Sequence, residues 1–167
     1  TLQRCSVFSL QKGEKMKRSE LNQIIKYTIE KVERKIPFPD FAYYSRKDWE
    51  NLPEKEQELI DNMLGWDITD FGTNDFQNVG LTIFTFRNGN FHNKEKYPKS
   101  YCEKLLYMLD GQMMPYHYHW YKTEDVINRG GGDLKITLYN SSSDDFANRE
   151  KMLRGEEGTF TNEPVII

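Results

Sequence analysis

The stretch from Gly111 to Gly132 holds two histidines and a glutamate whose types and spacing suit a metal site. His117 and His119 are two positions apart, so on an extended strand both imidazoles project from the same face. Glu124 follows five residues after His119, and a turn between them can return its carboxylate to the imidazoles. Two neutral imidazoles and one carboxylate suit Mn²⁺, Fe²⁺, Co²⁺ or Zn²⁺, and the lack of a thiol disfavours a structural zinc site.

Strands must position these side chains, and from Trp66 onward the apolar pattern alternates as strands require. Asn88 and Gly89 form a strong hairpin signal after the first expected strand. The run Gly130–Gly132 follows no strand-then-helix pattern, so it predicts a tight turn rather than a phosphate-binding loop. Residues 164–167 resemble part of a further strand. The other expected strands cover residues 81–86, 101–109, 113–120 and 133–140.

The N-terminal third is expected to be helical. From Ser19, apolar residues recur at three and four positions, which predicts a helix with Ser19 as its N-cap that ends by Pro37. Ser45 begins a capping-box pattern that predicts a second, short helix. Pro53 suits the first turn of another helical segment, which Gly65 stops. Helices followed by short strands predict a mainly β chain, an antiparallel sandwich or barrel with helices in front.

Composition restricts the class of protein. The chain has 167 residues and a net charge of −3 with no basic block, which argues against nucleic acid or an anionic membrane as a partner. Cys5 and Cys102 lie far apart without C-x-x-C spacing, which favours a reducing compartment. No apolar run approaches the roughly 18 residues that span a bilayer. We therefore expect a cytoplasmic protein.

The sequences at the two ends of the chain lead to predictions about domain organisation. Residues 1–15 have neither a helical nor a strand period, and we expect a non-native upstream extension with Met16 as the true start. Residues 16–65 are expected to form a helical segment, and residues 66–167 a partial barrel of the same domain. Because the last residues read as an unfinished strand, the domain is expected to continue beyond Ile167.

The spacing of the metal-site stretch resembles the first motif of the cupin superfamily. It runs from Gly111 through His117, His119 and Glu124 to Gly131, with both glycines and all three ligand types at the offsets of that motif. Two histidines alone on a strand are as often a coincidence as a ligand pair, so the glutamate and the glycines carry the resemblance. It implies a cupin jelly-roll barrel, here incomplete at the C-terminus and preceded by helices.

Further blocks narrow the resemblance to the D-lyxose isomerase family of cupin-type sugar isomerases. They are MKRSELN at 16–22, LGWDITDFG at 64–72, GLTIFTFRNG at 80–89, YCEKLLYMLDGQMMPYHYHW at 101–120 and EDVINRGGG at 124–132. The resemblance implies a metal, usually Mn²⁺, held by the two histidines and the glutamate of the motif together with a later histidine. It also places Lys104 in the sugar pocket and implies a homodimer. The later histidine is absent, since the only other one is His92, and we expect the fourth ligand beyond Ile167.

The function that this resemblance implies is a metal-dependent aldose–ketose isomerase acting on D-lyxose and D-xylulose, and on D-mannose and D-fructose as a second pair. The divalent metal would stabilise the enediolate, and Lys104 would donate a hydrogen bond or proton to a substrate oxygen. Glu103 is adjacent, but strand alternation puts it on the opposite face from Lys104. The alternatives are another metal cupin, such as an Fe²⁺-dependent oxygenase, and a non-enzymatic sugar-binding fragment.

Overall fold

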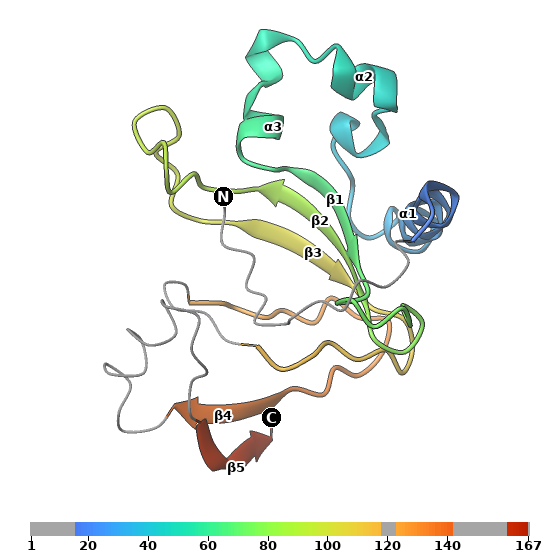
Figure 1. Cartoon of the computed structure of the whole chain (residues 1–167), viewed down its shortest axis with the longest axis vertical. Helices are drawn as coiled ribbons and strands as arrows, with labels where there is room; N and C mark the ends of the chain where they lie inside the picture. Colours follow the sequence, from blue (N-terminus) through green and yellow to red (C-terminus); the bar gives the residue numbers. More distant parts are fainter. Residues whose placement is uncertain (1–15, 118–122, 142–159, 167) are drawn as a thin grey trace. The chain divides into compact units, whose positions relative to one another are not determined.

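The computed structural model describes residues 16–117, 123–141 and 160–166 (Figure 1). The chain divides into two compact units, with the boundary between Pro115 and Tyr116. The first unit contains described residues 16–115, and the second contains residues 116–117, 123–141 and 160–166.

The first unit begins with helix α1 (Arg18–Val32), which confirms the expected helix. The N-cap is Lys17 rather than Ser19, so the predicted cap position is wrong by two residues. The reason is local, because the Glu20 carboxylate accepts a hydrogen bond from the Lys17 N–H at 2.7 Å. A carboxylate in the first turn also complements the helix dipole. A glutamate three residues after the cap has therefore fixed where this helix starts.

Short helical segments follow α1 and lead to the sheet. They are the 3₁₀ helix η1 (Asp40–Tyr43), α2 (Arg46–Glu50), the 3₁₀ helix η2 (Glu54–Glu56) and α3 (Glu58–Asp61). The capping box expected at Ser45 is present: the Ser45 N–H donates to the Asp48 carboxylate at 2.7 Å, and the Asp48 N–H donates to the Ser45 hydroxyl at 3.4 Å. The capping box thus stabilises the N-terminus of α2, although that helix is only five residues long.

Strands β1 (Gly65–Thr69), β2 (Leu81–Arg87) and β3 (Glu103–Tyr107) form an antiparallel sheet with β2 in the centre (Figure 1). β2 pairs with both neighbours in antiparallel fashion. The hairpin expected at Asn88 and Gly89 is wrong, because a long loop of residues 88–102 joins β2 to β3. The Asn88 amide donates instead to the Asn62 carbonyl oxygen at 2.9 Å, so this residue anchors the loop to the end of α3.

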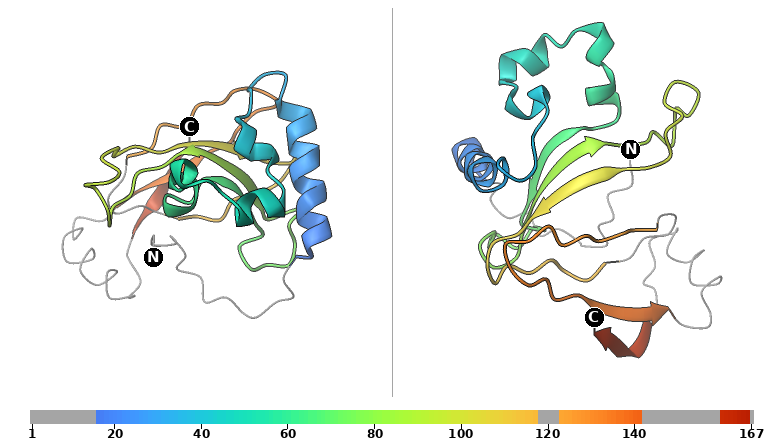
Figure 2. Two further views of the ribbon diagram at one scale, coloured as in Figure 1. Left: turned by 90° about the horizontal axis from the view of Figure 1, so that it is seen from above. Right: turned by 180° about the vertical axis from the view of Figure 1, so that it is seen from behind.

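One face of this sheet carries the aromatic core. Phe84, at the centre of β2, is completely buried. Its ring centroid lies 4.8 Å from that of Trp66, 5.1 Å from that of Phe38 and 5.3 Å from that of Phe41. The last two residues belong to the segment before α2, so the helical part of the chain covers this face (Figure 2). Tyr27 of α1 also contacts Tyr107 of β3, with ring centroids 6.3 Å apart.

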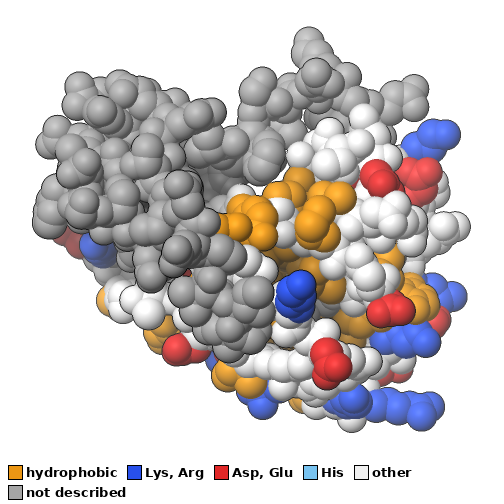
Figure 3. All heavy atoms as spheres, turned by 90° about the horizontal axis from the view of Figure 1, so that it is seen from below, with side chains coloured by type: hydrophobic (Ala, Val, Ile, Leu, Met, Phe, Trp, Pro, Cys, Tyr) orange, Lys and Arg blue, Asp and Glu red, His pale blue; other side chains and the backbone are white. Residues whose placement is uncertain are grey.

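Large hydrophobic side chains also remain at the surface. On the face of the molecule that Figure 3 shows, hydrophobic side chains gather between charged ones. Tyr43, Met63 and Leu106 of the first unit are each about half exposed, at 55%, 52% and 49%. Single exposed apolar residues are common on soluble domains, so only their grouping on one surface carries information.

The second unit contains a two-stranded antiparallel sheet of β4 (Thr137–Ser141) and β5 (Phe160–Ile166). The strand expected at 133–140 is present but begins at Thr137, and the strand expected near the C-terminus is β5. The expected strand at 113–120 is wrong for its described part, residues 113–117, where Met113 makes only an isolated bridge to Val79. Pro115 gives a physical reason, since it has no N–H to donate to a ladder. Residues 118–120 lie outside the described part of the chain.

The expectation of a mainly β chain preceded by helices is confirmed, with helices up to α3 and strands from β1 onward. Among the described residues the strands form two separate sheets and no closed barrel. In the same part of the chain, no helix is long and apolar enough to cross a membrane. The longest, α1, has 15 residues.

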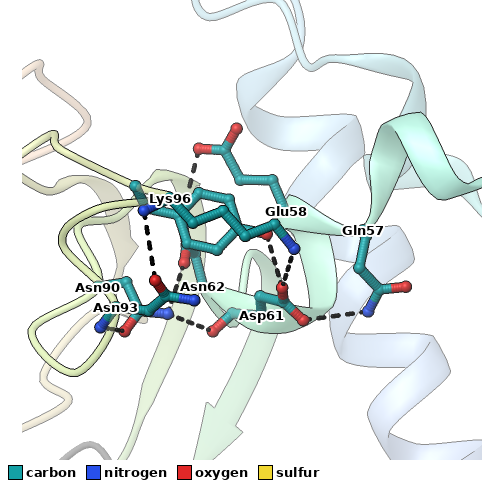
Figure 4. A network of polar contacts seen from close by, with 8 residues as sticks. Gln57, Glu58, Asp61, Asn62, Asn90, Asn93 and Lys96 are labelled. Atoms are coloured by element: carbon teal, nitrogen blue, oxygen red, sulfur yellow. Dashed lines mark hydrogen bonds and ion pairs between the residues drawn. The ribbon is translucent and has the colours of Figure 1, made fainter.

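A network of polar contacts centred on Asp61 holds the long loop between β2 and β3 against α3 (Figure 4). The Asp61 carboxylate accepts hydrogen bonds from the Tyr97 hydroxyl at 2.6 Å, from the Lys96 ammonium at 3.0 Å and from the Gln57 amide at 3.1 Å. These donors, with Tyr97 contributing most, lower the pKa of Asp61 from 3.8 to about 2. Asn90 adds a contact to the Asp61 carbonyl oxygen at 3.2 Å.

Asp61→Asn is expected to lower the melting temperature near neutral pH, because the amide loses the charge that the three donors stabilise. Since the folded pKa lies below 3.8, the stabilisation is present above 3.8 and is lost as pH falls through about 2. The difference between variant and unaltered protein should therefore shrink over that range in thermal melts. Glu95→Gln, an exposed change in the same loop, is the control; an equal effect of both variants would contradict the prediction.

Candidate functional site

Lys104 is the second residue of β3 and lies opposite Thr85 of β2. Strand alternation puts its side chain on the sheet face opposite to Phe84 and the aromatic core. The side chain is exposed. Within the described part of the chain, no hydrogen bond or ion pair involves Lys104.

Glu103 precedes Lys104 in β3, and regular alternation along this strand puts its side chain on the opposite face. Its carboxylate forms an ion pair with Arg87, beside a bulge in the pairing of β2 with β3. Both side chains are about half exposed, which makes this a surface pair of small energetic value. Glu103 is therefore engaged away from the face that Lys104 occupies.

The face around Lys104 follows from the register of the three strands. Thr85 and Leu81 on this face are almost fully buried, at 5% and 3% exposure. The first row across the sheet contains Gly65, Thr85 and Lys104, and the second contains Asp67, Ile83 and Leu106. Thr69 pairs with Leu81 in a third row. This face of the sheet, the floor of the candidate site, is therefore built mostly from small or apolar side chains. It carries one cation, Lys104, and one carboxylate, Asp67.

The described residues of the expected metal site lie in the second unit. His117 and Glu124 are both exposed, and each takes part in an interaction. His119 lies outside the described residues. Among the residues that the structure does describe, no three histidine, cysteine, aspartate or glutamate side chains come close enough to hold a metal ion. His92, the remaining histidine, lies in the long loop of the first unit.

The chemistry of the expected ligands nevertheless fits a divalent metal. Imidazole nitrogens and a carboxylate oxygen suit first-row metals from Mn²⁺ to Zn²⁺. The turn after Glu124 is also built as expected, because Gly130 and Gly131 have φ angles of 106° and 104°. The Asn128 side chain accepts from the Gly130 N–H at 2.8 Å, and it donates to the Gly132 carbonyl oxygen at 3.0 Å. These contacts confirm the expected tight turn.

Asp67 was not singled out by reasoning from the sequence, although alternation in its strand places it away from the core. In the strand GWDIT, alternation separates Asp67 from Trp66, which is a core residue. A charge facing away from the core in a short strand is usually solvated, so nothing in the sequence alone distinguished it. The register with β2 places it on the Lys104 face.

A family profile described as D-lyxose isomerase matches residues 16–159. The chain belongs to the D-lyxose isomerase family. It is 44% identical over 132 residues to the D-lyxose/D-mannose isomerase of Serratia proteamaculans, covering 78% of this chain and 58% of the relative. It is 42% identical, with the same coverage, to the D-lyxose/D-mannose isomerase of Escherichia coli O157:H7. The chain thus spans somewhat more than half the length of these members of the D-lyxose isomerase family.

Proposed function

We propose that the protein is an aldose–ketose isomerase that interconverts D-lyxose and D-xylulose, with D-mannose and D-fructose as a second pair. The observation that carries the proposal is the 44% identity to a protein named D-lyxose/D-mannose isomerase. The matched region includes the first unit with Lys104 and the positions of the histidine–glutamate motif. Membership of the D-lyxose isomerase family supports a reaction on the same class of sugar.

In this proposal His117, His119 and Glu124 hold a divalent metal, with Mn²⁺ as the expected ion. The support is the donor set, two imidazoles and a carboxylate at the spacing of the family motif. When bound, the metal supplies positive charge that stabilises negative charge developing on the substrate oxygens. Metal dependence separates this proposal from catalysis by side chains alone.

Lys104 has a defined task in the isomerisation. The reaction moves a proton from C2 of the aldose to C1 of the ketose, while the carbonyl and hydroxyl oxygens exchange roles. The exposed ammonium of Lys104, which has no partner among the described residues, donates a hydrogen bond to one of these oxygens and lowers the cost of its developing charge. Glu103 is an unsuitable base for the carbon-bound proton, since it pairs with Arg87 on the other face.

We also propose a cytoplasmic homodimer. The wide separation of Cys5 and Cys102 supports a reducing compartment. The homodimer follows from the resemblance of the sequence to the D-lyxose isomerase family. Sedimentation analysis of the purified protein gives the mass in solution directly.

The proposed function is tested by measuring ketose formation from D-lyxose with and without a chelator. We expect D-xylulose to form, a chelator to stop the reaction and added Mn²⁺ to restore it. His117→Gln should lower the bound metal and the rate by at least about tenfold to a hundredfold, the loss typical for a disturbed metal site. His92→Gln is the matched control, because His92 is an exposed loop histidine outside the motif.

Three outcomes would contradict the proposal in different ways. Oxygen consumption that requires Fe²⁺ would favour a metal-dependent oxygenase. Binding of D-lyxose with no ketose formed would favour a non-enzymatic sugar-binding protein. Equal loss of activity in the His117→Gln and His92→Gln variants would remove the special role of the motif histidine.

A further inference from the structure

Asp67 and Lys104 carry opposite charges on the same face of the sheet. Asp67 of β1 pairs with Ile83, and Lys104 of β3 pairs with Thr85, two positions further along the same central strand. Directly opposed residues in an antiparallel sheet share a face, and so do residues two apart on one strand. Both charges therefore project from the face that lies opposite to the aromatic core around Phe84.

Neither charge has a protein partner in the part of the chain that the structure describes. No hydrogen bond or ion pair involves the Asp67 carboxylate there, and the same holds for the Lys104 ammonium. Two other aspartates of the first unit differ in this respect: Asp61 accepts three hydrogen bonds, and Asp70 accepts hydrogen bonds from the Gly72 and Asn74 N–H groups. The described contacts therefore give the Asp67 carboxylate no structural role of the kind that Asp61 and Asp70 have.

The distance between the two charges suits a small polar ligand. Neighbouring strands lie about 4.8 Å apart, so β1 and β3 are separated by about 10 Å, and a step of two residues adds about 7 Å along the strand. The Cα atoms are therefore about 12 Å apart, too far for a direct ion pair. Ile83 and Thr85 of the central strand lie between them in the register. A five- or six-carbon sugar, contacted by one side chain at each end, is long enough to span this separation.

We propose that Asp67 is a substrate-binding residue that accepts hydrogen bonds from sugar hydroxyl groups at the end remote from the reacting carbons. A carboxylate is a pure acceptor with two oxygens, which suits a pair of vicinal hydroxyl groups. Lys104 contacts the reacting end of the sugar. Asp67 therefore discriminates between sugars by the length and stereochemistry of the rest of their carbon chain. This inference rests on the proposed function, because it takes the sugar and the role of Lys104 from it.

An edge strand offers another reason for such a carboxylate. Charged side chains that point inward on edge strands oppose pairing with other chains, and β1 is at one edge of its sheet. That role requires only a charge at position 67 and no sugar. It predicts aggregation of an uncharged variant with unchanged sugar recognition, so the experiment below distinguishes the two roles.

The test measures the KM and kcat for D-lyxose, and calorimetric binding of D-lyxose, with Mn²⁺-loaded protein carrying Asp67→Asn or Asp67→Ala. We expect KM and the dissociation constant to rise about tenfold to a hundredfold, as for loss of one hydrogen bond to a charged group. We expect kcat to change less, because the contact is made equally in the ground and transition states. Asp110→Asn, an exposed carboxylate change in the turn after β3, is the matched control.

The binding affinity for deoxy sugars distinguishes a sugar-binding role of Asp67 from a merely structural one. The unaltered protein should bind D-lyxose more tightly than an analogue lacking the C4 or the C5 hydroxyl, and Asp67→Ala should abolish that difference for at least one analogue. Retention of both differences in the alanine variant, or an unchanged KM in Asp67→Asn, would overturn the inference while leaving the proposed function intact. Sugar binding without isomerisation by the unaltered protein would overturn only the proposed function, and no sugar binding at all would overturn both.

Discussion

Lys104→Met is expected to lower kcat for D-lyxose isomerisation by about a hundredfold or more, the contribution typical of a positioned proton donor. Methionine has nearly the length of lysine without its charge, so the floor of the sheet keeps its shape. The Lys104 ammonium has no protein partner within the described residues, so the variant breaks no ion pair and should keep its stability. Initial rates of ketose formation and thermal melts measure the two properties on the same sample.

Glu103→Gln is the matched control for this variant. It changes the adjacent residue on the same strand, but its side chain faces away and pairs with Arg87 at the surface. Loss of that exposed pair should cost little stability and leave kcat unchanged. If Lys104→Met retained full activity, or if both variants lost activity equally, Lys104 would have no specific part in the reaction.

Phe84→Ala should have the largest effect on stability, a loss of about 3–5 kcal/mol in the free energy of unfolding. Phe84 is completely buried on the central strand, and its ring contacts Trp66, Phe38 and Phe41. Removing the ring leaves a cavity between the sheet and the segment that covers it. Urea denaturation followed by tryptophan fluorescence measures the loss, because the Trp66 ring centroid is 4.8 Å from that of Phe84.

Phe91→Ala is the control for Phe84→Ala. Phe91 is also a phenylalanine of the first unit, but its side chain is 68% exposed in the long loop. Its removal should change the free energy of unfolding by no more than about 0.5 kcal/mol. A loss for Phe84→Ala as small as that for Phe91→Ala would show that the aromatic cluster is not the stabilising core of this unit.

Local signals in the sequence predicted the helices well. The capping box at Ser45 and the apolar stripe of α1 each depend on residues within one or two turns, and both were found. The cap of α1 was misplaced because Ser19 and Glu20 offered competing starts, and the carboxylate determined the outcome. The Asn88–Gly89 hairpin failed for a non-local reason, since Asn88 binds the Asn62 carbonyl oxygen, 26 positions away.

The candidate site likewise contains one feature that a local pattern predicts and others that depend on distant parts of the sequence. The alternation that separates Lys104 from Glu103 needs only neighbouring residues, so it could be predicted from the sequence of one strand. The place of Asp67 beside the Lys104 face depends on the pairing of β1 with β2 and of β2 with β3, which no local pattern encodes. The metal ligands His117, His119 and Glu124 stay a prediction from motif spacing, and His119 lies outside the described residues.

The side chains of β2 alternate between the aromatic core and the Lys104 face, and this affects how the sequence of the protein can evolve. Trp66 and Phe84 hold the strand register from the covered side, and a slip of one residue would turn Asp67 to the wrong face. Substitutions at Thr85 or Ile83 leave that aromatic contact untouched. In the proposed enzyme, substitutions on the Lys104 face of the sheet can therefore change the preferred sugar, while the aromatic face maintains the fold.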